Sequence, residues 1–100
     1  MKEMTPKEVS QAIKNNKDVS IIDVREDEEV AEGMIPGALH IPLGQIQDRI
    51  DDIDKDKEHV MVCRSGGRSG KAGSFLEKEG YNVINMTGGM LDWEDEVTPK

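Results

Sequence analysis

Apolar residues recur at helical spacing near the start of the chain. The segment Met4–Val9 is typical of a helix N-terminus, with Thr5 as the capping residue, Pro6 at the first helical position and Glu8 completing a capping box. The apolar positions that follow keep the period of one helix face. We therefore predict a helix that begins after Thr5 and ends at Asn15–Asn16.

Three later segments also have helical character. Glu26–Glu32 is predicted to form a short helix that Gly33 stops, since glycine commonly follows the last helical turn. In Leu43–Ile53 the isoleucines keep a helical period and polar residues fill the other face. Gly66–Glu79 has apolar residues on one face, and the glycine at position 80 favours a helix end there.

Short runs rich in β-branched residues lie between these helices and predict strands. They are Val19–Val24, Ala38–Ile41, His59–Val62 and Val83–Met86, of which the second is a short strand at most. A turn around Leu91–Trp93 is expected near the end of the chain. Because strands alternate with helices, the pattern favours an α/β layer structure with a mainly parallel sheet.

Two residues with functional side chains lie at or just after the ends of predicted strands. Asp23 lies near the end of one strand, and Cys63 comes directly after another. Ligands of parallel sheets bind at the carboxyl ends of the strands. We therefore expect a functional site at the edge of the sheet that Asp23 and Cys63 share.

Composition and charge narrow the class of protein. The 100 residues fit a single domain over residues 1–100. With 13 basic and 21 acidic side chains, the formal charge of −8 opposes binding to nucleic acid and to an anionic membrane surface. No apolar stretch is long enough for a transmembrane helix or a signal peptide, so a cytoplasmic location is expected. The single cysteine, Cys63, excludes an internal disulfide and a C-x-x-C redox motif.

Charge is distributed unevenly along the chain. The acidic runs Glu26–Glu29 and Asp51–Asp56 are expected to form solvated faces or turns. By contrast, the eighteen residues of the segment His59–Leu76 include no Asp or Glu. The basic residues of that segment are Arg64, Arg68 and Lys71. We therefore expect a locally positive field within an acidic protein.

The loop Cys63–Ser69 carries the candidate chemistry. It joins a predicted strand to a predicted helix, and its adjacent glycines let consecutive backbone N–H groups turn inward as a cradle for an anion. A thiol at a helix N-terminus beside arginines has a lowered pKa, which makes Cys63 a candidate nucleophile. The alternative is that Cys63 continues the preceding strand as a small buried hydrophobic residue.

Motifs outside this loop also carry a resemblance to a known family. Together with Cys63–Ser69, they are the strand end Ile22–Glu26, the run Gly33–Pro42, and Gly88–Gly89 with Trp93 after it. In this order the chain resembles the single-domain rhodanese family, which is thiosulfate sulfurtransferase-like. The resemblance implies a three-layer α/β/α fold with a five-stranded, mainly parallel sheet. It also implies a sulfurtransferase that forms a cysteine persulfide. The methionine at position 34 departs from the pattern, since many relatives have a histidine there.

Two other functions remain open. Cysteine-dependent phosphatases and arsenate reductases have a C-x5-R loop, whereas Cys63 and Arg68 form C-x4-R. The shorter loop makes a tighter bowl, suited in this resemblance to a sulfane sulfur and too small for a tetrahedral phosphate on the cysteine. The other alternative is a noncatalytic module for sulfide sensing or regulatory interaction.

The resemblance implies that the Cys63 thiolate takes the outer sulfur of thiosulfate or a related donor and passes it to a thiophilic acceptor, cyanide in an assay. The residues expected to bind the substrate are Arg64, Ser65, Gly66, Gly67, Arg68 and Ser69. The two arginines suit sulfonate oxygens, because a guanidinium group offers a bidentate face. Neither a metal nor an organic cofactor is needed for this chemistry.

Four other polar residues are expected to support the structure rather than to react. Asp23 and Arg25 are expected to organise neighbouring loops, and His40 and His59 to be structural. The expected partners are a small anionic sulfur donor and an external thiol or sulfur-acceptor protein. An external acceptor is needed because the chain has no second cysteine to resolve a persulfide on Cys63.

Overall fold

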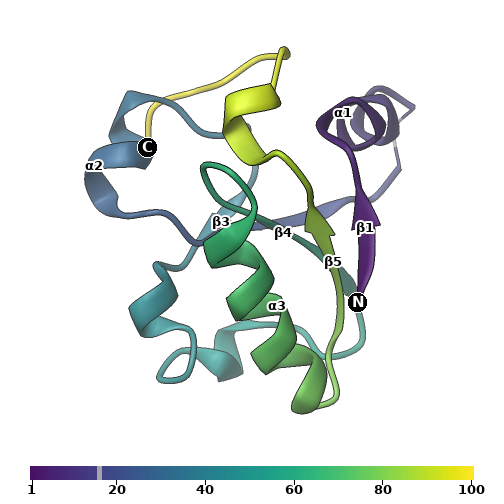
Figure 1. Ribbon diagram of the computed structural model, residues 1–100, viewed down its shortest axis with the longest axis vertical. Coiled ribbons are helices and arrows are strands. Elements are labelled where there is room, and N and C mark those ends of the chain that lie inside the picture. The colour runs from purple at the N-terminus through teal and green to yellow at the C-terminus, as the bar shows by residue number, and fades with distance from the viewer. Residues whose placement is uncertain (16) are drawn as a thin grey trace.

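A five-stranded sheet lies at the centre of the structure, a computed structural model that describes residues 1–15 and 17–100. The strands are β1 (Lys2–Met4), β2 (Ser20–Asp23), β3 (Leu39–His40), β4 (Glu58–Val62) and β5 (Asn82–Met86). They lie in the order β1-β5-β4-β2-β3, and each pairing is parallel (Figure 1). The predicted α/β class with a mainly parallel sheet is confirmed.

The edge strand β1 is the element that the hydrophobic pattern does not predict. Lys2 and Glu3 are exposed, and β1 pairs with β5 at the edge of the sheet. A three-residue strand of this composition has neither a clear alternation nor an apolar run. Its position depends on pairing with residues more than eighty positions later, such as Ile84 opposite Lys2.

The helices are α1 (Pro6–Lys14), α2 (Asp27–Glu32) and α3 (Gly67–Lys78). The predicted capping box at the start of α1 is confirmed: the Glu8 amide donates to Thr5 Oγ1 at 3.1 Å, and the Thr5 amide donates to Glu8 Oε1 at 2.9 Å. Asn15 caps the end of α1, whereas Asn16 lies outside the described residues. Within residues 1–15 and 17–100, no helix has the length and apolar character needed to cross a membrane.

The helix predicted over Leu43–Ile53 is wrong. The segment forms two 3-10 turns instead, η1 (Leu43–Gln45) and η2 (Ile50–Asp52). The glycine in η1 lowers helix propensity, and the backbone at Arg49 leaves the helical region with φ −109° and ψ 20°. Ile46 and Ile53 are nevertheless buried, so the periodic isoleucines reach the core through turns rather than through a helix.

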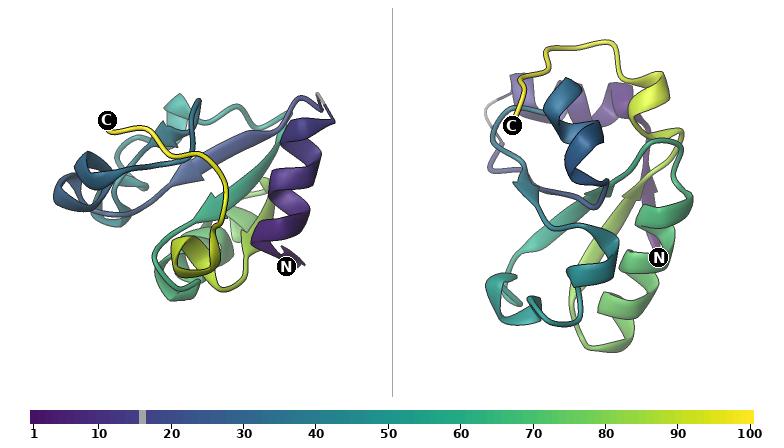
Figure 2. Two further views of the ribbon diagram at one scale, coloured as in Figure 1. Left: turned by 90° about the horizontal axis from the view of Figure 1, so that it is seen from above. Right: turned by 90° about the vertical axis from the view of Figure 1, so that its left-hand side faces the viewer.

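Separate apolar cores lie on the two faces of the sheet, because successive side chains of a strand point to opposite sides. On β4, Met61 packs in the core that contains residues of α3, whereas Val60 and Val62 pack in the core that contains Val9 of α1. The predicted three-layer α/β/α arrangement is therefore confirmed (Figure 2). Cys63 belongs to the core on the α3 side, at the point where β4 has just ended.

The C-terminal segment crosses to α2 and ends beside it (Figures 1 and 2). Met34 and Thr98 exchange two backbone hydrogen bonds of 2.8 Å, and the Lys100 amide donates to the Val30 carbonyl at 3.1 Å. This segment therefore fixes α2 against the rest of the fold, and α2 lies next to the loop that follows β4.

Candidate active site

The loop that contains Cys63 is held between β4, α3 and a pair of glycines. Gly66 has φ +105°, a left-handed conformation that turns the chain into α3. Behind the loop, the Met90 amide donates to the Cys63 carbonyl at 2.9 Å. Gly89 lies so close that a Cβ atom there would be 2.5 Å from the Cys63 and Arg64 carbonyl oxygens. The Gly88–Gly89 motif therefore supports the loop by close backbone contact.

The Cys63 sulfur lies within reach of hydrogen-bond donors. The Gly66 amide donates to Sγ at 3.0 Å, and Ser69 Oγ is 3.3 Å from it. Burial of the thiol opposes its ionisation, but hydrogen bonds from the Ser69 hydroxyl and from backbone amides outweigh it, so the pKa of Cys63 is lowered. A thiolate in this position is a nucleophile, even though Cys63 is only 1% exposed and packs with the core.

Asn85 is a site residue that the sequence reasoning missed. Its Oδ1 lies 2.6 Å from Ser69 Oγ and is the alternative acceptor for the hydroxyl proton that can also be donated to Cys63, and its Nδ2 donates to the Gly66 carbonyl at 3.2 Å. Asn85 therefore contacts two of the residues that donate hydrogen bonds to the Cys63 sulfur, Ser69 and Gly66. A polar residue among the apolar residues of a predicted core strand was the available signal, because a buried amide needs hydrogen-bond partners.

Arg68 is paired within the protein. Its Nη1 donates to Glu29 Oε1 at 2.6 Å and its Nη2 donates to Glu29 Oε2 at 2.8 Å. The Arg68 hydrogen bonds lower the pKa of Glu29 to about 2, and Glu29 raises the pKa of Arg68 in return. The expectation that Glu26–Glu29 forms a solvated face or a turn is wrong for Glu29, which lies in a helix and is paired with Arg68. Although the segment from His59 to Leu76 has no acid of its own, α2 brings one to it.

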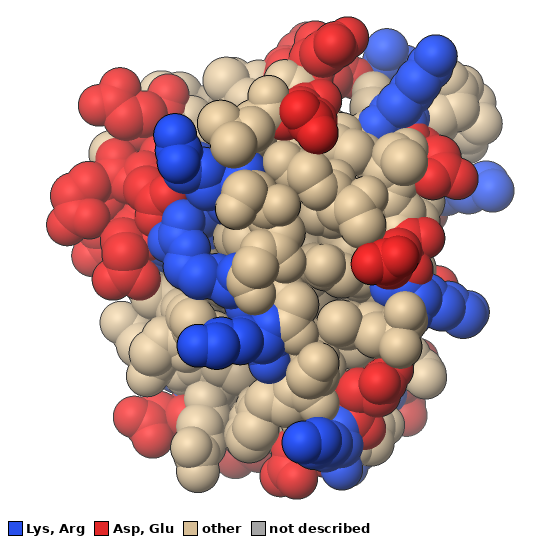
Figure 3. Space-filling view, in the orientation of Figure 1, with Lys and Arg blue, Asp and Glu red and all other residues tan. Residues whose placement is uncertain are grey.

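The other predicted binding residues lie around the loop. Arg64, Ser65 and Gly67 are exposed, whereas Ser69 is buried beside Cys63. Among the described residues, no ion pair engages Arg64. On the face shown in Figure 3, basic side chains form a line next to a cluster of acidic ones. The loop thus has one paired arginine and one exposed arginine.

Asp23 and Arg25 form a second ion pair at the same sheet edge. The Arg25 side chain donates from Nη2 to Asp23 Oδ2 at 2.9 Å and from Nε to both carboxylate oxygens at 3.1 Å. Arg25 Nη2 also donates to the Gly33 carbonyl at 2.8 Å. The pair is buried and joins the end of β2 to the end of α2.

Both histidines are occupied by partners other than Cys63. His40 Nε2 contacts the Arg25 carbonyl at 2.7 Å, and Lys100 Nζ contacts His40 Nδ1 at 2.8 Å. His59 lies near the opposite end of β4, where its Nδ1 is 2.7 Å from Ser20 Oγ. Each ring is buried with both nitrogens in contact with a polar atom.

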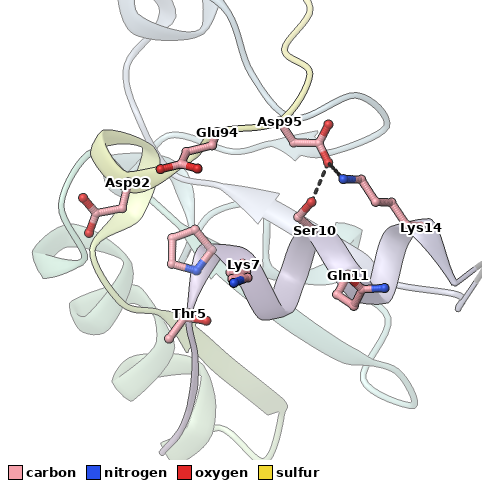
Figure 4. Close-up of a pocket in the computed structure, with 9 residues that line it drawn as sticks. Thr5, Lys7, Ser10, Gln11, Lys14, Asp92, Glu94 and Asp95 are labelled. Atoms are coloured by element: carbon pink, nitrogen blue, oxygen red, sulfur yellow. Dashed lines mark hydrogen bonds and ion pairs between the residues drawn. The ribbon is translucent and has the colours of Figure 1, made fainter.

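A separate open groove lies between α1 and the segment that follows the 3-10 helix η3 (Gly89–Asp92) (Figure 4). No residue of the Cys63–Ser69 loop lines it. Inside the groove, the Ser10 hydroxyl donates to Asp95, and Lys14 lies 3.4 Å from the same carboxylate. These three polar groups already satisfy one another, and the groove is separate from the loop that contains Cys63.

Comparison with known proteins places this geometry in a family. The family model of the rhodanese-like domain matches residues 5–96. The chain belongs to the rhodanese-like family. Over the whole chain and 97% of the relative, it is 46% identical to "Putative sulfurtransferase YtwF" of Bacillus subtilis. It is 39% identical to "Sulfurtransferase" of Allochromatium vinosum over 97% of this chain and 92% of that one.

A solved rhodanese-like domain protein from Staphylococcus aureus has the same architecture. It superposes with a TM-score of 0.94 and 40% identity, over 100% of this chain and 99% of that chain. Membership in the family supports sulfurtransferase activity, and therefore a transferase, for the chain described here.

Proposed function

We propose that this protein is a thiosulfate sulfurtransferase that carries sulfur as a persulfide on Cys63. The observation that supports the proposal best is the position of the Cys63 sulfur, which lies at the end of a parallel strand with the Gly66 amide and the Ser69 hydroxyl beside it. These donors lower the pKa of the thiol, and the thiolate is the form that attacks a sulfane sulfur.

In the first half-reaction, the Cys63 thiolate attacks the outer sulfur of thiosulfate. A new S–S bond forms on Sγ, the S–S bond of thiosulfate breaks, and sulfite leaves with the electron pair. Backbone amides of the loop stabilise the resulting persulfide anion, in the manner of an oxyanion hole. The residues that bind the donor in this proposal are Arg64, Ser65, Gly66, Gly67, Arg68 and Ser69.

In the second half-reaction, an acceptor attacks the outer sulfur of the persulfide and the Cys63 thiolate leaves. Cyanide becomes thiocyanate in this step. In a cell the acceptor is a small thiol or a sulfur-acceptor protein, because the chain has no second cysteine. The cytoplasm suits this chemistry, since thiols stay reduced there. The proposed steps need neither a metal nor an organic cofactor.

The mass of the intact protein tests this proposal. Incubation with thiosulfate should add one sulfur, about 32 Da, cyanide should remove it as thiocyanate, and Cys63→Ser should abolish both changes. The circular dichroism spectrum of Cys63→Ser should match that of the wild type, because one atom is exchanged. An unmodified wild-type mass with no thiocyanate would contradict the proposal and favour a regulatory module.

Hydrolysis of an aryl phosphate separates this function from that of cysteine-dependent phosphatases. We expect no meaningful hydrolysis, because the spacing from Cys63 to Arg68 is one residue shorter than in a C-x5-R loop. Phosphate turnover comparable with sulfur transfer would contradict the argument from loop length.

A further inference from the structure

The guanidinium group of Arg68 has its two terminal nitrogens engaged before any substrate arrives. Both donate to the Glu29 carboxylate, at 2.6 and 2.8 Å. This bidentate geometry is the same that an arginine uses to bind sulfonate oxygens. Arg68 lies in the first turn of α3, five positions after Cys63. One of the two loop arginines expected to bind an anionic donor is therefore already paired with an anion.

Glu29 is held in this position by a second contact. Its Oε1 also accepts a hydrogen bond of 3.0 Å from the Glu26 amide, which closes the capping box at the start of α2. The helix is anchored in turn, because the Arg25 side chain and the C-terminal segment bind the chain at its end. The Glu29 carboxylate is thus presented to Arg68 by a fixed element.

We infer that Glu29 determines which sulfur donors the site accepts, by withholding the Arg68 guanidinium from them. The inference rests on the proposed sulfur transfer through Cys63. Thiosulfate remains a donor, but Glu29 lowers kcat/KM for this dianion relative to that for sulfane donors of lower negative charge, such as alkyl thiosulfonates.

Charge near the loop explains the direction of this selection. A thiosulfate dianion has to compete with a tethered carboxylate for Arg68. Charges separated by less than about 8 Å are poorly screened at physiological ionic strength. A donor with one charge fewer meets less repulsion and depends less on the guanidinium group.

The substitution Glu29→Gln tests the inference with little change in shape. Glutamine keeps one oxygen that can accept from the Glu26 amide, so the capping box is retained. Its side chain is neutral, however, so it places no anionic oxygen against Arg68. Glu28→Gln is the matched control, because it removes the same charge from an exposed position on the same turn. Circular dichroism should show that both variants are folded.

The measurement is kcat/KM with thiosulfate and with methanethiosulfonate. Methanethiosulfonate also transfers its outer sulfur, and it releases methanesulfinate. In Glu29→Gln we expect kcat/KM for thiosulfate to rise roughly three- to tenfold, and that for methanethiosulfonate to rise roughly twofold or less. In Glu28→Gln both values should change less than twofold. The same comparison in an Arg68→Gln background should lose most of the selective gain, since no guanidinium is left to release.

A readout independent of turnover is the pH midpoint of Cys63 alkylation by iodoacetamide. It should fall in Glu29→Gln, because the Arg68 charge is no longer neutralised, and change less in Glu28→Gln. If Glu29→Gln does not fold, Glu29→Asp should shift the donor ratio in the same direction by a smaller amount, since its shorter side chain breaks the two-point contact.

The possible failures are distinguishable. If neither donor adds sulfur to the wild-type protein, the proposed sulfur transfer is wrong. If both donors add sulfur but Glu29→Gln leaves their ratio and the alkylation midpoint unchanged, only the role of Glu29 is wrong. A gain of the same size in Glu28→Gln would also overturn that role, since it would reflect net charge alone.

Discussion

Two arginine–carboxylate pairs lie at the same edge of the sheet and differ in exposure. The side chains of Asp23 and Arg25 are 1% and 8% exposed, whereas those of Glu29 and Arg68 are 27% and 33% exposed. The first pair joins residues two positions apart, and the second joins segments 39 positions apart. We therefore expect the two pairs to differ in role, with the buried pair supporting the fold and the partly exposed pair affecting the electrostatics of the site.

The two guanidinium groups differ in how accessible they are to a ligand. Arg25 is enclosed, and its Nη2 is shared between Asp23 and the Gly33 carbonyl, so it supports the backbone around α2. Arg68 lies at the surface, where a solvated anion can compete with Glu29. Breaking the buried pair should damage the fold, and breaking the exposed pair should change the chemistry.

The largest expected effect comes from Asp23→Ala. This variant leaves the Arg25 charge buried and unpaired, which should lower the free energy of unfolding by roughly 3–5 kcal/mol. Urea unfolding followed by circular dichroism measures it, with Glu28→Ala as a control in which an exposed acid is removed. A loss in Asp23→Ala no larger than in the control would show that the buried pair does not support the fold.

His40 extends the buried pair, since its ring contacts the Arg25 carbonyl. We expect His40→Ala to lower the free energy of unfolding by roughly 1–3 kcal/mol, because a buried carbonyl loses its partner. The alkylation midpoint of Cys63 should stay where it is in the wild type. His59→Ala, which alters a buried histidine near the other end of β4, should give the same pattern. A shifted midpoint in either variant would identify a histidine as the activating base.

Arg68 should show the opposite pattern to His40. Arg68→Ala should cost about 1 kcal/mol of stability or less, because the pair is partly exposed. It should also raise the pH midpoint of Cys63 alkylation and weaken thiosulfate turnover, since positive charge near the thiolate is lost and Glu29 is left unpaired. Arg68→Lys should recover more of the thiolate activation than of the turnover, because lysine lacks the bidentate fork. Equal recovery of both would contradict this division.

The features predicted correctly from the sequence depend on neighbouring residues. The capping box of α1 is encoded within four positions, and the end of α3 is marked by Gly80, which has φ +91°. The approach of Cys63 and Asp23 follows from parallel strands, where Asp23 pairs with Val62. In each case the local pattern and the final structure agree.

The missed features depend on contacts between distant segments. Asn85 reaches Ser69 from β5, sixteen positions away, and Glu29 reaches Arg68 across 39 positions. No short-range pattern encodes these pairings. The segment from His59 to Leu76 contains no Asp or Glu, but the electric field at the loop also depends on residues from other segments. One of these is Glu29 of α2, whose carboxylate is paired with Arg68.

The smallest expected effect is the contribution of Glu29 to the pH dependence of stability. Hydrogen bonds from Arg68 lower its pKa from the usual 4.5 to about 2, so the folded state holds the carboxylate charged more strongly than the unfolded chain does. The contribution is fully present above about pH 4.5 and is lost as the pH falls through about 2. Because solvent screens this exposed pair, we expect about 1 kcal/mol or less.

Urea unfolding of wild type and Glu29→Gln at several pH values measures this contribution. The difference in stability should be constant near neutral pH, shrink between about pH 4.5 and 2, and decrease further in high salt, where surface charges are screened. The corresponding comparison for Glu28→Gln should show little dependence on pH in this window, since its carboxylate is exposed. A difference that stays the same from neutral pH down to about pH 2 would mean that Glu29 stabilises the fold through its shape rather than through its charge on Arg68, and the contrast between the two arginine pairs would fail.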